Sequence, residues 1–123
     1  MENLELTEST DTPHVHLDSI TGTVKIDGKS YMEDASSFYR PIINWIIKYI
    51  SNGAKQATVD INLTYYNSTT AKYLLKILFL FKKENMLENL QVNWHYNKED
   101  ELNEERGKEM QIIVGIEFKQ ISH

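Results

Sequence analysis

The chain of 123 residues contains no cysteine, so disulfide bonds, thiolate zinc sites and cysteine nucleophiles are all excluded. The same absence leaves the redox compartment undetermined. No apolar run is long enough to span a bilayer, and the first 16 residues show no basic stretch followed by an apolar one. We therefore expect a cytoplasmic protein with neither a signal peptide nor a membrane-spanning helix.

Positive charge is scarce relative to negative charge. The sequence has 13 Lys and Arg residues against 18 Asp and Glu residues, which gives a formal net charge of −5 at pH 7 with histidine neutral. A surface of this sign repels the phosphate backbone of nucleic acids and the headgroups of anionic lipids. We therefore expect neither nucleic acid nor a membrane as a partner.

The length and the 41% hydrophobic content are sufficient for one packed core. We expect a single domain over residues 13–123. Residues 1–12 are polar and acidic, with Leu4 and Leu6 among their few apolar side chains. This segment is predicted to be a flexible or extended lead-in, and it is a candidate edge strand. The sequence shows no internal repeat and no low-complexity tract.

Three segments alternate apolar and polar residues, the pattern of strands with one face in a core. They predict a β-hairpin over residues 14–27 and strands over residues 57–66 and 90–96. The apolar residues of segment 110–118 predict a final strand. The charged segment before it, residues 97–109, is predicted to be a solvated connection with at most one helical turn.

Helical spacing of apolar residues occurs in two segments. The first begins near Asp34 and ends at Asn52. Pro41 cannot donate an interior helix hydrogen bond, so either the helix proper begins there or a short first turn precedes a bend. The second helix is expected from about Thr69 to Asn85. The resulting order, ββαβαββ, predicts an α/β fold with two main helices and a mixed sheet of four to five strands, because strand–helix–strand crossovers join parallel strands.

Four hydrogen-bonding side chains, Asn67-Ser68-Thr69-Thr70, stand at the junction between a predicted strand and the second helix. The N-terminus of a helix favours negative charge, so a hydroxyl there is well placed to carry a phosphate. The structural alternative is capping, since Asn, Ser and Thr are preferred N-cap residues. One cap needs only one of the four. No glycine-rich loop precedes them, which argues against a nucleotide site.

Three blocks resemble the SiaC family of bacterial regulatory phosphoproteins: "GKSYMEDASSFYRPIINWIIKYI", "LTYYNSTTAKYLLKIL" and "VNWHYNKEDELNEERGKEM". The likeness extends from about Pro13 onward. Family members are similar in architecture to anti-sigma-factor-antagonist (STAS) domains and carry a phosphorylatable hydroxyl at the start of the helix that follows a central strand. Their motif is roughly Asn-Thr-Ser-Ser, so the acceptor maps to Ser68, with Thr69 and Thr70 as alternatives. Ser68 stands where the family has threonine, and Met32 stands where it commonly has proline.

The resemblance implies a non-enzymatic regulatory phosphoprotein that switches partner binding, with no catalytic residue, cofactor or metal. It implies a protein Ser/Thr kinase, a PP2C-type phosphatase and an output enzyme such as a diguanylate cyclase as partners. We expect the partner surface to surround Ser68, and core packing explains at least two of its aromatic members equally well. The expected members are Tyr65, Tyr66, Asn67, Thr69, Thr70, Lys72, Trp94 and Tyr96.

A second interpretation is a small metal-binding protein or enzyme. His14 and His16 share one face of a predicted strand and could supply two ligands, although no third ligand stands at a known spacing. The acidic loop lacks the glycine of an EF-hand. A third interpretation is a structural adaptor whose hydroxyl cluster only caps a helix. The acidic loop contains Glu99, Asp100, Glu101, Glu104 and Glu105.

Overall fold

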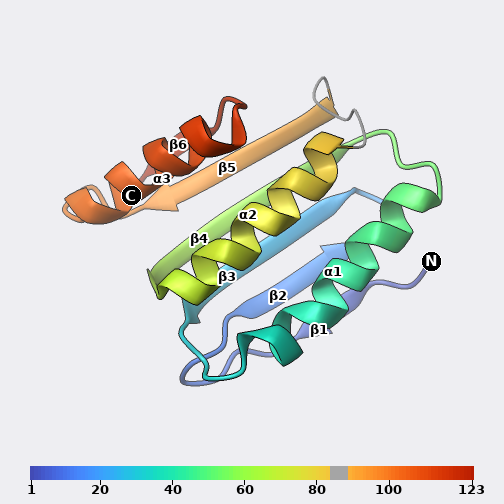
Figure 1. Ribbon diagram of the computed structural model, residues 1–123, viewed down its shortest axis with the longest axis horizontal. Helices are drawn as coiled ribbons and strands as arrows, with labels where there is room; N and C mark the ends of the chain where they lie inside the picture. Colours follow the sequence, from blue (N-terminus) through green and yellow to red (C-terminus); the bar gives the residue numbers. More distant parts are fainter. Residues whose placement is uncertain (84–88) are drawn as a thin grey trace.

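The alternating segments form a mixed sheet in the computed structural model, which describes residues 1–83 and 89–123 (Figure 1). Within these residues the sheet has six strands, which lie side by side in sequence order from β1 to β6. The pairs β1–β2 and β2–β3 are antiparallel, and the pairs from β3 to β6 are parallel. The strands are β1 (Leu4–Leu6), β2 (His14–Asp18), β3 (Thr23–Ser30), β4 (Ala57–Tyr66), β5 (Leu90–Tyr96) and β6 (Lys119–Ser122).

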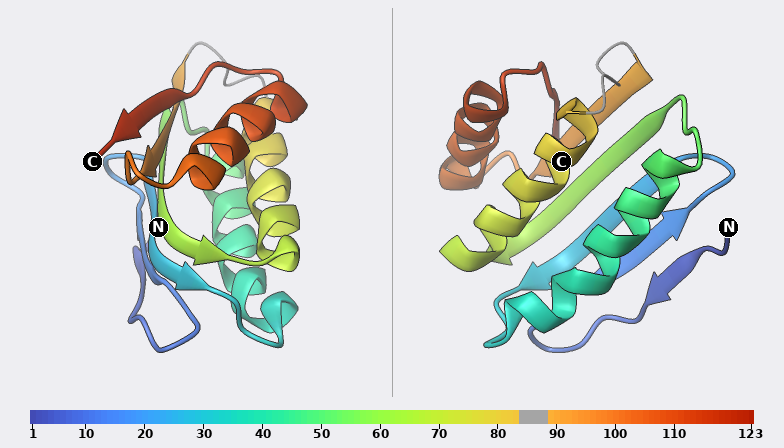
Figure 2. Two further views of the ribbon diagram at one scale, coloured as in Figure 1. Left: turned by 90° about the vertical axis from the view of Figure 1, so that its left-hand side faces the viewer. Right: turned by 45° about the vertical axis from the view of Figure 1, so that its right-hand side comes forward.

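Each parallel pair is joined by a helix: α1 (Ala35–Ser51), α2 (Ser68–Lys83) and α3 (Glu101–Val114). Parallel crossovers are almost always right-handed, and here every crossover advances in the same direction along the sheet. The helices consequently all lie on one face, and among the described residues none covers the opposite face (Figure 2). No helix in the described part of the chain is long and apolar enough to cross a bilayer.

The core lies between the three helices and the face of the sheet that they cover. Alternate residues of the strands point into it, where they meet the apolar faces of α1 and α2 and the buried face of α3. Burial of this apolar area is the main stabilising contribution to the fold. The fully buried side chains with the largest volumes are Trp94, Tyr39, Phe81, Leu17, Ile26, Ile42, Ile46, Ile61, Leu63, Leu74, Ile77 and Leu78.

The predicted α/β class with a mixed sheet is confirmed, but the element counts were too low. The described residues form six strands and three helices, whereas four to five strands and two helices were predicted. One added strand is β1, in the segment predicted to be a lead-in. Pro41 lies inside α1, so of the two alternatives for this proline the start of the helix at Pro41 is wrong, and helical residues precede it. The first turn forms because the Asp34 carboxylate accepts a hydrogen bond from the Ser37 N–H at 3.1 Å.

The charged segment 97–109 and the predicted strand 110–118 were assigned wrongly. Most of their length forms α3, and the last strand is β6. The helix is delimited by Asp100, whose side chain caps its N-terminus, and by Gly115, which ends it in the left-handed conformation with φ of 78°. The predicted end of the second helix, Asn85, lies outside the described residues.

The reason for the error lies in the buried face of α3. That face consists of Asn103, Gly107, Met110 and Val114, spaced as one side of a helix. Two of these residues are not apolar, so the helical period was hidden in the pattern of hydrophobic residues, and the run that ends at Val114 resembled a strand.

Candidate functional site

A β-bulge in β4 directs the chain toward the start of α2. Gly28 pairs with Leu63 and the next residue of β3 pairs with Tyr65, so Thr64 is an extra residue in β4. Strict alternation from Leu63 would point Tyr65 into the core and Tyr66 outward. The bulge reverses this: Tyr66 is only 5% exposed and Tyr65 is 55% exposed. Bulges commonly re-aim side chains next to functional sites in this way.

Two of the four polar residues at the start of α2 have structural roles. The side-chain oxygen of Asn67 accepts a hydrogen bond from the Thr70 N–H at 2.9 Å and so caps the helix. The Thr70 hydroxyl is buried and donates to the Ser30 carbonyl at 2.9 Å. The Ser30 hydroxyl lies 2.7 Å from the Thr70 hydroxyl and 2.8 Å from that of Tyr39, whose pKa is raised by burial to about 12. Thr70 thus joins the start of α2 to the end of β3 through buried hydrogen bonds to Ser30.

We expect Thr70→Val to lower the free energy of unfolding by about 1–3 kcal/mol, because it removes one partner from a buried hydrogen-bond network. The Ser30 hydroxyl retains Tyr39 as a partner, which places the effect toward the lower end. Urea denaturation measures the change. Thr69→Val is the matched control, since Thr69 is exposed one position earlier and its replacement should change stability by no more than about 0.5 kcal/mol. Equal effects of the two substitutions would contradict the fastening role.

Ser68 and Thr69 are exposed on the first turn of α2. Ser68 lies at a hollow of about 250 Å³ between α2 and α3. Its lining is mostly apolar, and Arg106 and Glu109 are the two ionisable residues of α3 in it. The other lining residues are Tyr66, Asn67, Ala71, Leu75, Met110 and Ile113.

Arg106 lies over the face of a buried aromatic ring. Its guanidinium carbon is 4.9 Å from the centre of the Tyr66 ring, within the range of a cation–π contact. Burial raises the pKa of the Tyr66 hydroxyl to about 12, although the charge of Arg106 opposes the rise. Within the described residues that buried hydroxyl makes no hydrogen bond of good geometry, although Arg106 approaches it closely enough to lower its pKa as a donor. Arg106 and Tyr66 therefore line the same hollow as Ser68.

Trp94 packs against Tyr66 on the core side of this hollow. It is 1% exposed, its ring packs edge-on against Tyr66 at 6.0 Å, and its indole N–H donates to the Asn103 carbonyl at 3.1 Å. A Cβ atom at Gly107 would overlap the indole ring, so α3 reaches the sheet only because this residue is glycine. The expectation that Trp94 contacts a partner is contradicted by its burial: it is a core residue.

The remaining predicted residues differ in exposure. Tyr65, Thr69 and Lys72 are exposed, and Asn67 and Tyr96 are half-buried. Tyr66 and Thr70 are buried, so neither presents its hydroxyl at the surface, and Thr70 is not an accessible phosphate acceptor. Sequence reasoning missed the α3 side of the hollow. The pair of Asp100 as an N-cap and Gly115 as a C-cap was the signal that could have located this helix.

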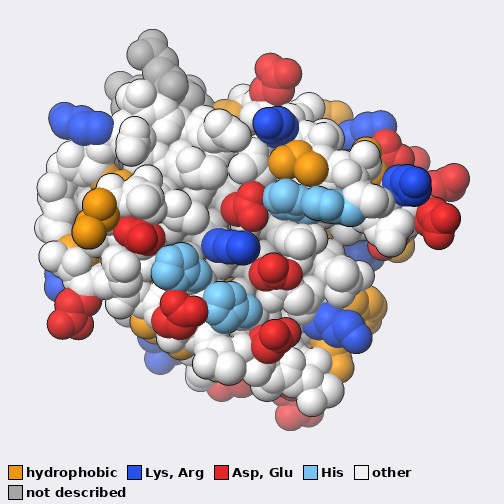
Figure 3. All heavy atoms as spheres, turned by 180° about the vertical axis from the view of Figure 1, so that it is seen from behind, with side chains coloured by type: hydrophobic (Ala, Val, Ile, Leu, Met, Phe, Trp, Pro, Cys, Tyr) orange, Lys and Arg blue, Asp and Glu red, His pale blue; other side chains and the backbone are white. Residues whose placement is uncertain are grey.

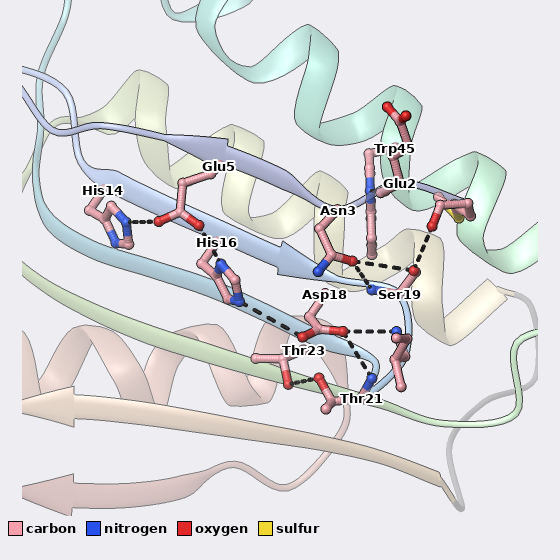
Figure 4. A network of polar contacts seen from close by, with 12 residues as sticks. Glu2, Asn3, Glu5, His14, His16, Asp18, Ser19, Thr21, Thr23 and Trp45 are labelled. Carbon is pink, nitrogen blue, oxygen red and sulfur yellow. Dashed lines mark hydrogen bonds and ion pairs between the residues drawn. The ribbon is translucent and has the colours of Figure 1, made fainter.

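The histidine pair of the second interpretation lies on the face of the sheet that the helices do not cover, together with the pair His95 and His123. Figure 3 shows imidazoles gathered in two places on this face, among side chains of both charges. The Glu5 carboxylate bridges His14 Nε2 and His16 Nδ1 at 2.7 Å each (Figure 4). His14-x-His16 therefore connects β2 to the edge strand β1.

The acidic residues of the same interpretation are elsewhere. They lie at the start of α3, which follows β5, and β5 is separated from β2 by β3 and β4. The fold thus does not bring the acidic segment to His14 and His16. Within residues 1–83 and 89–123, no three histidine or carboxylate side chains are grouped so that they could hold a metal ion.

The bridge at Glu5 predicts a pH-dependent β1. Hydrogen bonds from His16 and His14 hold the pKa of the Glu5 carboxyl below its ordinary value of 4.5. A lowered pKa stabilises the fold above the ordinary value, and this contribution is lost as the pH falls through the lower folded-state value. The protection of the Leu4 and Leu6 amides against hydrogen exchange, relative to their intrinsic exchange rates at each pH, should therefore fall below about pH 4.5 in the wild type. Glu5→Gln should remove this dependence and Glu8→Gln should retain it. Identical pH profiles for wild type and Glu5→Gln would refute the bridge.

These features define a small α/β protein with helices on one face of a mixed sheet and an exposed hydroxyl at a helix N-terminus, beside a hollow between two helices. The chain belongs to the SiaC family of regulatory phosphoproteins, whose sequence profile matches residues 6–123. The predicted resemblance is thereby confirmed. An uncharacterized protein of Pseudomonas aeruginosa strain UCBPP-PA14 is 24% identical over 100% of this chain and 98% of its own length.

Solved structures show the same fold. SiaC of Pseudomonas aeruginosa superposes with a TM-score of 0.90 and 22% identity, covering 100% of both chains. A structure of the diguanylate cyclase SiaD in complex with its activator SiaC, also from Pseudomonas aeruginosa, matches with a TM-score of 0.90 and 23% identity, covering 98% of this chain and 99% of the other.

Proposed function

We propose that this chain is a non-enzymatic cytoplasmic switch protein that binds an output signalling enzyme in one phosphorylation state of Ser68 and releases it in the other. The observation that carries the proposal is the division of roles at the start of α2. Asn67 caps the helix and Thr70 fastens it to Ser30, whereas Ser68 is exposed at the first helical position. Ser68 is therefore available for modification without loss of either structural contact.

The local electrostatics are compatible with a phosphate at this position. A phosphate adds a charge of about −1.5 to −2 at neutral pH and three acceptor oxygens. The backbone N–H groups and the dipole at the N-terminus of α2 favour such a charge. Thr69 is also exposed and is the alternative acceptor, while buried Thr70 is the least suitable of the three.

The partners are proposed by analogy with the family. SiaC of Pseudomonas aeruginosa shares the fold and is the activator in a complex with the diguanylate cyclase SiaD, which supports a diguanylate cyclase as the output enzyme here. The family description as regulatory phosphoproteins supports a kinase and a phosphatase as the enzymes that set the state, and a Ser/Thr kinase and a PP2C-type phosphatase are the ones proposed here. The accessible residues of the proposed contact surface are Tyr65, Asn67, Ser68, Thr69, Lys72 and Tyr96.

Phosphosite mapping by mass spectrometry tests the proposal on protein isolated from its host. We expect phosphate on Ser68 and none on Ser68→Ala. Phosphate on Thr69 that persists in Ser68→Ala would show that the residue is wrong and that the switch survives. An unmodified chain under all growth conditions would refute the switch. Metal analysis of the same sample tests the rival function, since stoichiometric metal without phosphate would favour a metal-binding protein.

A further inference from the structure

Ser68 and Arg106 line the same hollow but come from different helices. Arg106 is half-buried and its guanidinium lies over the Tyr66 ring at 4.9 Å. Among the ion pairs of residues 1–83 and 89–123, none involves Arg106. Within the described residues the guanidinium thus has Tyr66 as a partner but no carboxylate, so its fork is not held by an anion.

Tyr66 supplies a second sign of a missing ligand. It is 5% exposed, it lines the hollow, and its buried hydroxyl makes no hydrogen bond of good geometry within the described residues, although Arg106 approaches it closely enough to lower its pKa. Buried polar groups are seldom left unpaired, and those that are call for an explanation such as an absent ligand. A hydroxyl at this position can donate to an acceptor that enters from the side of Ser68.

We propose that phosphate on Ser68 is received within the same chain by the guanidinium of Arg106, with the Tyr66 hydroxyl as an additional donor. Phosphoryl transfer from a nucleoside triphosphate forms the bond between Ser68 Oγ and phosphorus, breaks the terminal bridging P–O bond and releases the serine proton. The product offers the dianion that the fork of an arginine matches with two parallel hydrogen bonds. Such a charge-assisted pair is stronger than a cation–π contact at a partly exposed site, so Arg106 turns from the ring to the phosphate.

The pairing would regulate the surface by joining α3 to the start of α2. Arg106 and the phosphate would then lie across the opening of the hollow, over its apolar wall of Leu75, Met110 and Ile113. Glu109 lines the same hollow and repels the phosphate, so its carboxylate must turn toward solvent. A partner that contacts the apolar wall is excluded in the phosphorylated state. This inference rests on the proposed function for its regulatory meaning, but the pairing itself is measurable without a kinase.

The experiment places phosphoserine at position 68 by co-translational incorporation and follows the phosphate by ³¹P NMR across its second ionisation. A cation that pairs with the dianion lowers the pKa of that ionisation. We expect Arg106→Gln to raise the phosphate pKa by about 1, a tenfold change in proton affinity. Arg106→Lys retains the charge but loses the fork, so its phosphate pKa should lie between the values of the wild type and Arg106→Gln. This variant remains informative if Arg106→Gln unfolds.

Two control variants decide between specific pairing and general charge effects. Lys108→Gln removes a positive charge from the same helix, where Lys108 is 59% exposed and ion-paired with Glu104 at 3.6 Å, and it should leave the phosphate pKa unchanged. Lys72→Gln removes the exposed cation one turn after Ser68 on α2. Equal pKa values in wild type and Arg106→Gln, or a shift caused by Lys72→Gln instead, would overturn the pairing. A host protein that is unmodified under all growth conditions would refute the proposed function and leave this measurement unaffected.

Discussion

Trp94→Ala is expected to lower the free energy of unfolding by about 3–5 kcal/mol, the range for a large aromatic residue removed from a core. Trp94 is 1% exposed and packs edge-on against Tyr66 and nearly parallel to Phe118, at 6.0 and 6.4 Å between ring centres. Its replacement leaves a cavity directly beneath Gly107 and removes the hydrogen bond to the Asn103 carbonyl. Urea denaturation followed by far-UV circular dichroism measures the loss.

Trp94→Ala also tests whether Trp94 is a core residue or part of a partner-binding surface. Tyr65→Ala is the comparison, because Tyr65 is 55% exposed at the end of β4 and its only close aromatic neighbour within the described residues is Tyr31. We expect Tyr65→Ala to change stability by less than about 1 kcal/mol. If Trp94→Ala left stability unchanged but reduced the affinity for a partner, the assignment of Trp94 to the core would be wrong and the expectation from the sequence would be restored.

Ser68→Asp is expected to change the affinity for partners by tenfold or more, equivalent to about 1.4 kcal/mol. This expectation rests on the proposed switch. The affinity should change in opposite directions for the kinase-side partner and for the output-side partner. Folding should be preserved, because a carboxylate at a helix N-terminus is favoured by about 0.3–1 kcal/mol and Asn67 still provides the cap. A carboxylate within a contact surface must instead be desolvated, which costs several kcal/mol unless the partner supplies a cation.

Titration calorimetry of the wild type, Ser68→Ala and Ser68→Asp against each partner measures these affinities. Ser68→Ala should cost at most about 1 kcal/mol of stability, since it removes neither the cap nor the contact of Thr70 with Ser30. Ser36→Asp is the matched control, because Ser36 is exposed on the first turn of α1 and belongs neither to the hollow nor to the proposed contact surface. The same affinity for all three Ser68 forms, with folding intact, would leave the cluster as a helix cap and no more.

The sequence was sufficient for the elements whose buried face is uniformly apolar. Val15 and Leu17 of β2 and the alternating residues of β4 showed the period of a strand, and α1 and α2 showed that of a helix. It was insufficient for α3, because the residue types on the face of α3 that contacts the sheet are set by the individual side chains and carbonyls they contact, not by a uniform apolar pattern. Gly107 is small because Trp94 occupies the space, and buried Asn103 donates to the Leu63 carbonyl at 3.2 Å. Neither requirement is visible until the two segments meet.

Composition, periodicity and motif by themselves determined that this protein has no disulfides, that it is an acidic α/β protein, and that a cluster of hydroxyls stands at the start of α2. Only the tertiary structure decided what each member of that cluster does. The Thr70 hydroxyl is hydrogen-bonded to the Ser30 carbonyl because the parallel pairing of β3 with β4 brings the end of β3 to the start of α2. Tyr66 is buried because a bulge reverses the alternation of side chains in β4. Arg106 lines the same hollow as Ser68 because α3 packs next to α2. Local propensity cannot encode these relations, since they join residues distant in the sequence through sheet register and helix packing.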